Sequence, residues 1–215
     1  MTAHPPRTRG RPPAADRARV TAAALRLLDE EGLDALTMRK LAAAVGVQAG
    51  TLYGYFPTKT ALLTAMAEAM LDGCRAAADG IAEPRERVLA LARSLRTALL
   101  SYRDGARVYA GTHATGPNTL GFAEALNGAL CEAGLDAAAA MKTALLVLHF
   151  ATGHALEEQA ALQSGPDLGA DIAHLREAIQ DGDYPHLAEA QDHLTGTDLS
   201  ELFEQGLRLL TADLP

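Results

Sequence analysis

The spacing of apolar residues constrains this chain more than any other feature, because in most stretches they recur every three or four residues. That spacing places them on one side of an α-helix, and no stretch alternates as a half-buried strand does. Aromatic residues make up only 4% and Trp is absent, so Leu, Ala and Val must build the core, which favours helix. The expected fold class is all-α. The spacing is clear near both ends, in Val20, Ala23, Ala24, Leu27 and Leu28 and in Leu199, Leu202, Phe203, Leu207 and Leu210.

Glycine and capping residues divide this pattern into separate helices. Gly46 stands where one helix must end, and Thr37 and Thr58 stand where helices can begin. Residues 164–195 are expected to be loop-like, with some helix around 172–179. The expected helices are residues 14–31, 38–45, 48–55, 59–78, 84–102, 105–111, 118–132, 136–163 and 199–210.

Charge is unevenly distributed along the chain. Residues 1–60 contain nine Lys or Arg and five Asp or Glu. The rest of the chain contains ten Lys or Arg and 22 Asp or Glu, and the formal net charge of the whole chain is −8. A basic N-terminal part on an acidic body suggests that the N-terminal part meets a polyanion. A basic tail without any partner is the alternative.

Two short helices with a glycine turn between them, preceded by an amphipathic helix, have the layout of a helix-turn-helix DNA-binding motif. Gly46 is the turn residue, where a positive φ costs little. The second short helix would lie in the major groove, and Lys59 can meet a phosphate. Its outward side chains, which can exchange hydrogen bonds with DNA, are Gln48, Thr51, Tyr53 and Tyr55. The small core that fixes the helix angle is expected from Leu41, Ala42, Val45, Val47 and Leu52.

The residues of this motif resemble the DNA-binding domain of the tetracycline repressor (TetR) family. The resemblance rests on Leu36–Ala42, Val45–Val47, Thr51–Phe56, and Lys59 with Ala61–Leu63. It implies an all-helical, dimeric repressor whose effector-binding body controls two DNA-binding heads on a double-stranded, inverted-repeat operator. The family positions that commonly touch DNA fall on Thr37, Arg39, Gln48, Thr51, Tyr53, Tyr55 and Lys59.

The chain departs from the tetracycline repressors at the start of the recognition helix. Ala49 and Gly50 stand where those proteins have larger residues that touch bases. Neither side chain can make a polar base contact, so base readout is expected to depend on Arg39, Gln48 and Thr51. Packing under the recognition helix is the alternative role for Tyr53.

Two segments of the body are similar to the tetracycline repressors in particular. Leu99–Thr112 is similar to their segment with a drug and magnesium contact, and Leu148–Glu157 is similar to their long dimerisation helix. Where they have the histidine that binds magnesium, this chain has Tyr109, whose protonated hydroxyl is a poor ligand for Mg²⁺. Glu157 still matches a position linked to the metal through water. Because the histidine is replaced, however, we expect a metal-free effector, no metal site and no cofactor.

The resemblance and the helical spacing together outline an effector pocket. His149, Gly153 and Glu157 are spaced four positions apart and therefore share one face of the long helix. A mostly apolar pocket with few polar anchors suits a planar, oxygenated molecule, such as an aromatic polyketide. Each lone histidine can instead be a surface or hydrogen-bonded residue, and His154 is expected to pair with Glu157 or Glu158. The polar lining is expected from Tyr109, Thr112, His113, Thr115, His149, Gly153 and Glu157, and the apolar walls from Leu95, Leu99, Phe122, Leu126, Leu145 and Phe150.

The first residues form a separate unit. Arg7–Pro13 resembles the core of an AT-hook, in which an extended arginine arm lies in a narrow, A·T-rich minor groove. A solvated tail that adds only non-specific attraction to DNA is the alternative. We divide the chain into a disordered basic arm (1–13), a helix-turn-helix DNA-binding domain (14–65) and a ligand-binding and dimerisation domain (66–215).

Other classes of function lack their sequence signatures. There is no Gly-x-Ser-x-Gly elbow, no Gly-rich phosphate loop and no His-Glu-x-x-His motif, so we do not expect an enzyme. The most apolar run, 137–153, is too interrupted to span a membrane, and Cys74 and Cys131 indicate a reduced, cytoplasmic protein. We expect a homodimer, formed through the helices at about 136–163 and 199–212, that represses transcription until a small molecule releases it. The alternative is a regulator of the same family without an effector.

Overall fold

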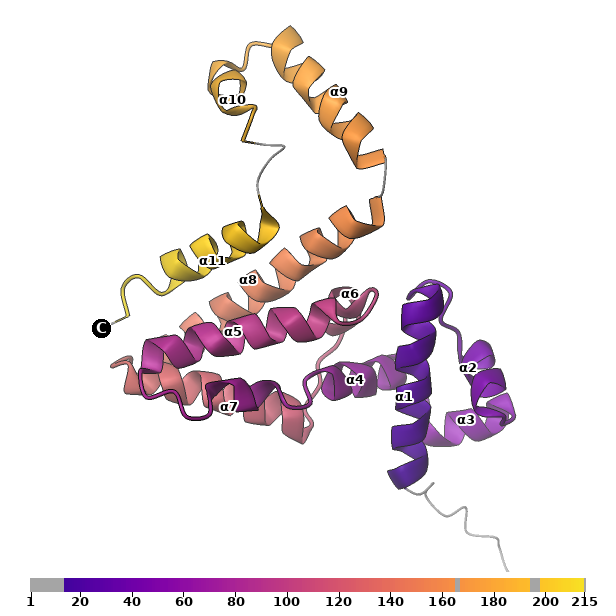
Figure 1. The fold of residues 1–215 in the computed structure, drawn as a ribbon. Coiled ribbons are helices and arrows are strands. Elements are labelled where there is room, and N and C mark those ends of the chain that lie inside the picture. Colours follow the sequence, from indigo (N-terminus) through magenta and orange to yellow (C-terminus); the bar gives the residue numbers. More distant parts are fainter. Residues whose placement is uncertain (1–13, 165–166, 194–197, 215) are drawn as a thin grey trace, which may run out of the picture.

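The computed structural model describes residues 14–164, 167–193 and 198–214, and the regular elements in these ranges are helices, as the sequence predicts. A small group of N-terminal helices lies beside a longer helical body (Figure 1). The expected basic arm, residues 1–13, lies outside the described residues. None of the described helices is long and apolar enough to cross a membrane. The elements are α1 (Ala14–Glu31), α2 (Met38–Val45), α3 (Ala49–Tyr55), α4 (Lys59–Met70), the 3-10 helix η1 (Cys74–Ala78), α5 (Pro84–Leu100), α6 (Gly105–Ala110), α7 (Pro117–Glu132), α8 (Ala137–Ser164), α9 (Asp167–Asp181), α10 (Pro185–Ala190) and α11 (Leu199–Leu210).

The head, which consists of α1, α2 and α3, folds around the small core that the motif predicts. Leu41 and Leu52 are fully buried, Val45 is 9% exposed, and Val20, Ala24 and Leu28 of α1 close the core from the other side. Burial of these side chains removes apolar surface from water, which is the main favourable contribution to folding. The head therefore holds α3 at a fixed angle to α2.

Local caps set the ends of these helices. The Thr37 hydroxyl oxygen accepts a hydrogen bond from the Lys40 backbone N–H, which begins α2. Gly46 ends α2 with a φ of 71°, a left-handed conformation that glycine adopts without a steric penalty. The Thr58 hydroxyl oxygen begins α4 by accepting from the Ala61 backbone N–H. The caps at Thr37, Gly46 and Thr58 are those that the sequence predicts.

The helix that begins at Lys59 is shorter than predicted. The prediction of one helix over 59–78 is wrong, because α4 ends at Met70 and η1 follows after a turn. The turn contains Gly73 with a φ of 77°, which an α-helix cannot accommodate. α4 packs against α1 of the head and also against α6 and α7 of the body, so it connects the two parts.

The body packs α5, α7 and α8 against one another, and α11 lies along α8 (Figure 1). Phe203 of α11 is fully buried and stacks on Phe150 of α8, with 5.4 Å between the ring centroids. Arg96 of α5 lies over the other end of this cluster, 4.9 Å from the Phe203 ring. The side chains at the centre of the body, each at most 1% exposed, are Leu91, Leu95, Phe122, Leu126 and Val147.

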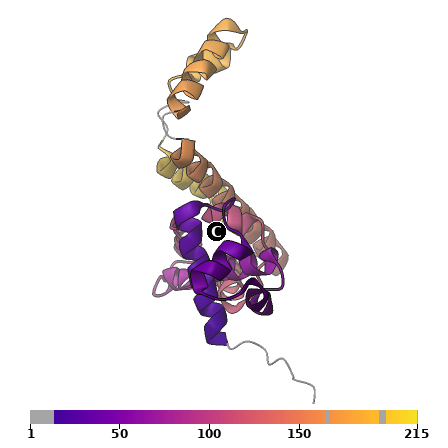
Figure 2. The ribbon, with the colours of Figure 1, turned by 90° about the vertical axis from the view of Figure 1, so that its right-hand side faces the viewer.

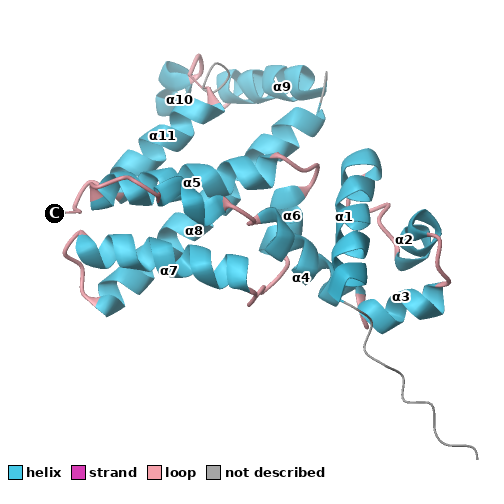
Figure 3. Ribbon diagram, turned by 60° about the horizontal axis from the view of Figure 1, so that its bottom comes forward, coloured by secondary structure: helices cyan, strands magenta, loops and turns pink. Residues whose placement is uncertain are grey.

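A buried amide fixes the corner between α5 and α6. The Gln159 Nε2 of α8 donates to the carbonyl oxygens of Leu99 and Tyr102, at 3.0 and 2.8 Å, and its Oε1 accepts from the Ala106 N–H at 3.1 Å. Gly105 lies in the same corner, where a Cβ would be only 2.2 Å from the Leu99 carbonyl oxygen. These contacts place α6 beside α4 and α1 (Figure 3).

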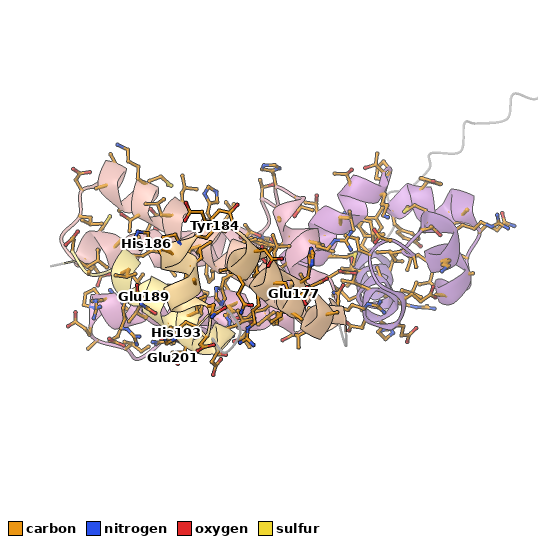
Figure 4. The ribbon with its side chains drawn as sticks, turned by 90° about the horizontal axis from the view of Figure 1, so that it is seen from above. Glu177, Tyr184, His186, Glu189, His193 and Glu201 are labelled. Carbon is orange, nitrogen blue, oxygen red and sulfur yellow. The ribbon has the colours of Figure 1, made fainter. Side chains whose placement is uncertain are left out.

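Residues 164–195 contain more helix than expected. Helix was predicted only around 172–179, whereas α9 spans Asp167–Asp181 and α10 spans Pro185–Ala190. These two helices project from the body beyond the end of α8 (Figures 1 and 2). Ile179 is buried, but all of α10 is exposed. In the view from above, the labelled residues Glu177, Tyr184, His186 and Glu189 mark the positions of α9 and α10 (Figure 4).

Candidate DNA interface and effector site

The side chains expected at DNA lie on the surface of the head and at the start of α4. They come from the first turn of α2, from α3 with its N-cap, and from the first residue of α4. These three short segments follow one another directly in the chain. Thr37, Arg39, Gln48, Thr51, Tyr53 and Lys59 are exposed, and Tyr55 is half-buried.

The core fixes which side of α3 faces outward. Leu52 and Phe56 are fully buried, whereas Tyr53 is 50% exposed and so does not fill the space beneath the helix. Arg17 of α1 lies over the Phe56 ring, 4.7 Å from its centroid, and closes the core at the end of α3. A Cβ built on Gly50 meets nothing within 4 Å, so the start of α3 is a bare surface that DNA can approach closely.

The cations of the head differ in how strongly they are already paired. Lys40 forms an ion pair with Glu31, and the Lys59 ammonium donates to the Leu33 carbonyl oxygen at 3.5 Å. Arg39 has no hydrogen bond or ion pair with another described residue. An exposed guanidinium presents several donors in one plane, which suits the acceptors of a guanine edge or a phosphate.

Asp104 joins the head to the body. This residue is 3% exposed, and its carboxylate accepts hydrogen bonds from the Leu33 backbone N–H at 2.8 Å, Arg107 at 3.1 Å and Gln163 at 3.2 Å. Burial raises the pKa of Asp104, but the three hydrogen bonds and the charge of Arg107 together hold that pKa below its ordinary value. We call these hydrogen bonds the Asp104 contact.

Two further polar interactions surround the Asp104 contact. The Arg103 backbone N–H donates to the Asp29 carboxylate at 2.9 Å, and Arg107 forms an ion pair with Asp34 at 3.0 Å. Asp29 and Asp34 flank the end of α1, whereas Arg103 and Arg107 belong to the corner before α6 and to α6 itself. The end of α1 is therefore held against α6 by hydrogen bonds with defined directions.

The structure brings together only some of the residues expected at the effector. The Thr112 hydroxyl donates to the Tyr109 carbonyl oxygen at 3.0 Å, while His113 and Thr115 are exposed on the loop that follows. Burial raises the pKa of the Tyr109 hydroxyl above its ordinary value, and the nearby Cys74 adds to this rise. That hydroxyl is therefore neutral at physiological pH. Leu95 and Phe122, expected as walls, are fully packed in the core.

The other expected effector residues lie on the outer side of α8. His149, Gly153 and Glu157 do share one face, as their spacing predicts, but all three are exposed in the single chain. The expected wall residue Leu145 lies on the same face and is 45% exposed. His154 instead points inward, 2.9 Å from Glu158, so its pairing with that residue is confirmed although it is buried.

Several grooves on the body are lined by residues other than those expected at the effector. Four such grooves have volumes of about 270 to 610 Å³. One groove, of about 280 Å³, lies where η1 meets the start of α7, and Arg75, Pro117 and Asn118 are among its lining residues. Within the described ranges, no three His, Cys, Asp or Glu side chains are grouped so that they could hold a metal ion.

Sequence reasoning missed two acidic residues that connect the parts of the molecule. Asp104 is one, and Glu68 of α4, which accepts hydrogen bonds from the first turn of α7, is the other. Glu68 and Lys59 are the two charged residues of α4, whose other residues are apolar except for Thr60 and Thr64. The one acid in a helix made mostly of apolar residues was a usable signal, because a carboxylate that is shielded from water needs a partner.

A helix-turn-helix that exposes polar and basic side chains, joined through α4 to a separate helical body, defines a DNA-binding regulator. Two family profiles match the chain: "Bacterial regulatory proteins, tetR family" over residues 20–66, and "Tetracyclin repressor-like, C-terminal domain" over residues 79–214. The chain therefore belongs to the TetR family of bacterial transcriptional regulators, with a DNA-binding and a ligand-binding domain.

Individual relatives agree with this assignment. The class A tetracycline repressor protein from transposon 1721 of Escherichia coli is 39% identical, over 91% of this chain and 88% of the relative. The crystal structure of a possible TetR family regulator from Streptomyces coelicolor A3(2) is 56% identical with a TM-score of 0.83, covering 93% of this chain and 98% of that one. ActR from Streptomyces coelicolor, solved in complex with actinorhodin, is 28% identical with a TM-score of 0.82, covering 92% and 95%.

Proposed function

We propose that the protein is a cytoplasmic repressor that binds an inverted-repeat operator as a homodimer and is released from it by a small, planar aromatic molecule without a metal. The observation that carries this proposal is the exposed polar face of α2 and α3, linked through α4 to the body. The family consists of DNA-binding regulators, which supports the expectation that the chain is not an enzyme. Its relatives include tetracycline repressors, which supports repression in particular.

Exposed apolar side chains on α8 and α11 support the homodimer. Leu145 and Leu146 of α8 are 45% and 56% exposed, and Leu202 and Leu209 of α11 are 42% and 71% exposed. Because α11 lies along α8, these residues can form one surface, and a surface of this kind on a soluble protein marks an interface. A two-fold dimer through it would place His149, Gly153 and Glu157 between the two subunits.

The contacts between head and body support control by an effector. The head is joined to the body at the Asp104 contact and through α4, so a movement of α6 or α7 changes the direction of the head. Two heads must stand about 34–36 Å apart to enter successive major grooves, so a small rotation breaks the match. Release is then a shift between two states, limited by how differently the effector binds them.

The chemistry of the effector is inferred from Tyr109 and from the relatives. A half-buried, neutral tyrosine in place of the metal-binding histidine offers a hydroxyl for hydrogen bonding and no ligand for Mg²⁺. Actinorhodin, which ActR binds, and tetracycline, after which the repressors are named, are both oxygenated, fused-ring compounds. We therefore propose an effector of this shape that binds in the presence of a chelator.

The experiment is an in vitro selection of DNA sequences that the full chain retains from a random library. Enrichment of an inverted repeat is expected. The selected DNA is then titrated with fused-ring aromatic compounds, actinorhodin and tetracycline included, with and without EDTA. Release that survives EDTA supports the proposal, and release that EDTA abolishes refutes its metal-free part. Selection of single half-sites would refute the dimeric operator, and DNA binding that no compound weakens would favour a regulator without an effector.

A further inference from the structure

Glu68 supplies the N-terminal cap of a helix to which it does not belong. Its Oε1 accepts from the Asn118 backbone N–H at 2.6 Å, and its Oε2 accepts from the Thr119 N–H at 3.1 Å and from the Thr119 hydroxyl at 2.6 Å. The Asn118 side-chain amide donates in return to the Glu68 carbonyl oxygen at 3.0 Å. We call these four hydrogen bonds, which join α4 to α7, the Glu68 contact.

The first turn of α7 provides no cap of its own. Its N-cap position is Gly116, which has no side chain, and its first residue is Pro117, which has no N–H. The N–H groups of the next two residues are left without a helical partner, and both are satisfied by Glu68. A carboxylate at this end is also favoured by the helix dipole. The first turn of α7 is therefore satisfied by Glu68 only while α4 occupies its present position.

The loop before α7 is shaped around this carboxylate. A Cβ built on Gly116 would lie 2.4 Å from the carboxyl carbon of Glu68 and 2.5 and 2.8 Å from its oxygens. Glycine alone leaves this space, so the loop cannot carry a side chain here while Glu68 remains bound. The same loop contains Thr112, His113 and Thr115, the residues expected at the effector.

A groove of about 280 Å³ lies directly against the contact. Pro117 and Asn118 line it from α7, and Leu71, Gly73 and Arg75 line it from the end of α4 and from η1. A bound molecule that displaces Pro117 or Asn118 also displaces the Asn118 and Thr119 N–H groups that Glu68 binds. Occupation of this groove and the position of α4 are thereby coupled through one side chain.

We propose that Glu68 is the positioning residue through which the loop before α7 controls the direction of the DNA-binding heads. The proposal rests on the proposed function. In the state that binds DNA the Glu68 contact is closed, and in the released state it is open. Because coupling free energy is reciprocal, operator DNA must tighten the contact by the same factor by which opening the contact weakens DNA binding.

The test needs only the full chain and its selected operator DNA. Hydrogen exchange of the Asn118 and Thr119 amides, which are far along the chain from the head, is measured with and without operator. In the wild type, operator DNA is expected to slow exchange at both amides several-fold. Glu68→Gln, which replaces one acceptor oxygen by an NH₂ donor, is expected to bind operator about tenfold more weakly and to lose this slowing.

Two further variants separate coupling from simple stabilisation. Thr119→Val removes the 2.6 Å hydrogen bond from the α7 side without changing α4. It is expected to weaken operator binding and to reduce the slowing of amide exchange by operator, each by a smaller factor than Glu68→Gln. Asp72→Asn neutralises an exposed carboxylate just past α4 and is expected to behave as the wild type. A purely structural contact would raise exchange equally with and without DNA in Glu68→Gln.

The outcomes distinguish this proposal from the proposed function. If the wild type binds operator but exchange at Asn118 and Thr119 does not respond to DNA, the positioning role is refuted and the repressor function stands. Equal operator affinity of Glu68→Gln, Asp72→Asn and the wild type also refutes it. If the wild type retains no DNA at all, the proposed function itself fails.

Discussion

Replacement of Asp104 is expected to destabilise the fold strongly, for two separable reasons. Its buried carboxylate accepts three hydrogen bonds, one of them from the Leu33 backbone N–H at 2.8 Å. Its φ of 58° is left-handed, a conformation that disfavours residues with a Cβ. Asp104→Ala removes the acceptors and keeps the unfavourable backbone. Asp104→Gly removes the same acceptors and relieves the backbone.

The magnitude follows from these two contributions. Loss of hydrogen bonds to a charged group, with a backbone N–H left unsatisfied, costs about 3 kcal/mol. A Cβ in the left-handed region costs about 1 kcal/mol more than glycine. Urea unfolding followed by circular dichroism, at one fixed protein concentration, measures both, because the stability of a dimer depends on concentration. Asp104→Ala should be the least stable variant, with Asp104→Gly about 1 kcal/mol above it.

The dependence on pH identifies the charge as the source. The folded-state pKa of Asp104 lies below its ordinary value, because the hydrogen bonds and Arg107 outweigh the effect of burial. A lowered pKa contributes stability at pH values above the unfolded pKa, about 3.9, and this contribution is lost as pH falls through the folded pKa. The difference between wild type and Asp104→Ala should therefore be constant from pH 7 to about 4 and shrink below that.

Two results would refute this reasoning. A difference that does not change between pH 5 and pH 3 would assign the effect to packing instead of the carboxylate charge. Equal stability of Asp104→Gly and Asp104→Ala would show that the backbone at this position is not under strain.

Three further predictions concern the DNA interface and the proposed dimer. Arg39→Ala should lower discrimination between operator and scrambled DNA, by about 1–3 kcal/mol for a base contact, whereas Lys59→Ala should weaken binding to both alike. Competition binding at fixed salt measures both, and an equal loss on both DNAs for Arg39→Ala would assign it to the backbone. Deletion of residues 1–13 should flatten the dependence of affinity on salt, since up to three arginines no longer displace counterions, and an unchanged slope would contradict this. Leu146→Glu should give a 22.5 kDa monomer in sedimentation, and a variant that still sediments as a dimer would exclude α8 from the interface.

The parts of the fold that the sequence predicted correctly are those with local causes. The ends of α2 and the start of α4 are set by Thr37, Gly46 and Thr58, each acting on residues within five positions. The break after α4 also had a local signal, Gly73. The alanine-rich stretch that follows favours helix, and that preference concealed the break in the sequence analysis.

The contacts that connect the domains have no local cause. Glu68 meets residues 50 and 51 positions away, and Asp104 meets a backbone N–H 71 positions away. The spacing of His149, Gly153 and Glu157 predicted a common face, which the structure has, but spacing does not say what that face meets. Only the packing of α8 against α5, α7 and α11 shows which of its sides is left exposed.

The α9–α10 projection is a region of low local stability that lies between α8 and α11 in the sequence. The 15-residue α9 and the six-residue α10 bury little apolar surface, and isolated helices of these lengths are marginal in water. Such a region opens locally at far less cost than global unfolding, so among the described helices we expect proteases to cut α9 and α10 first. The segment after the cut is still held by the buried Phe203 and by the paired Arg93 and Glu204. A nicked protein will therefore migrate as two fragments under denaturing conditions and as one intact particle under native ones.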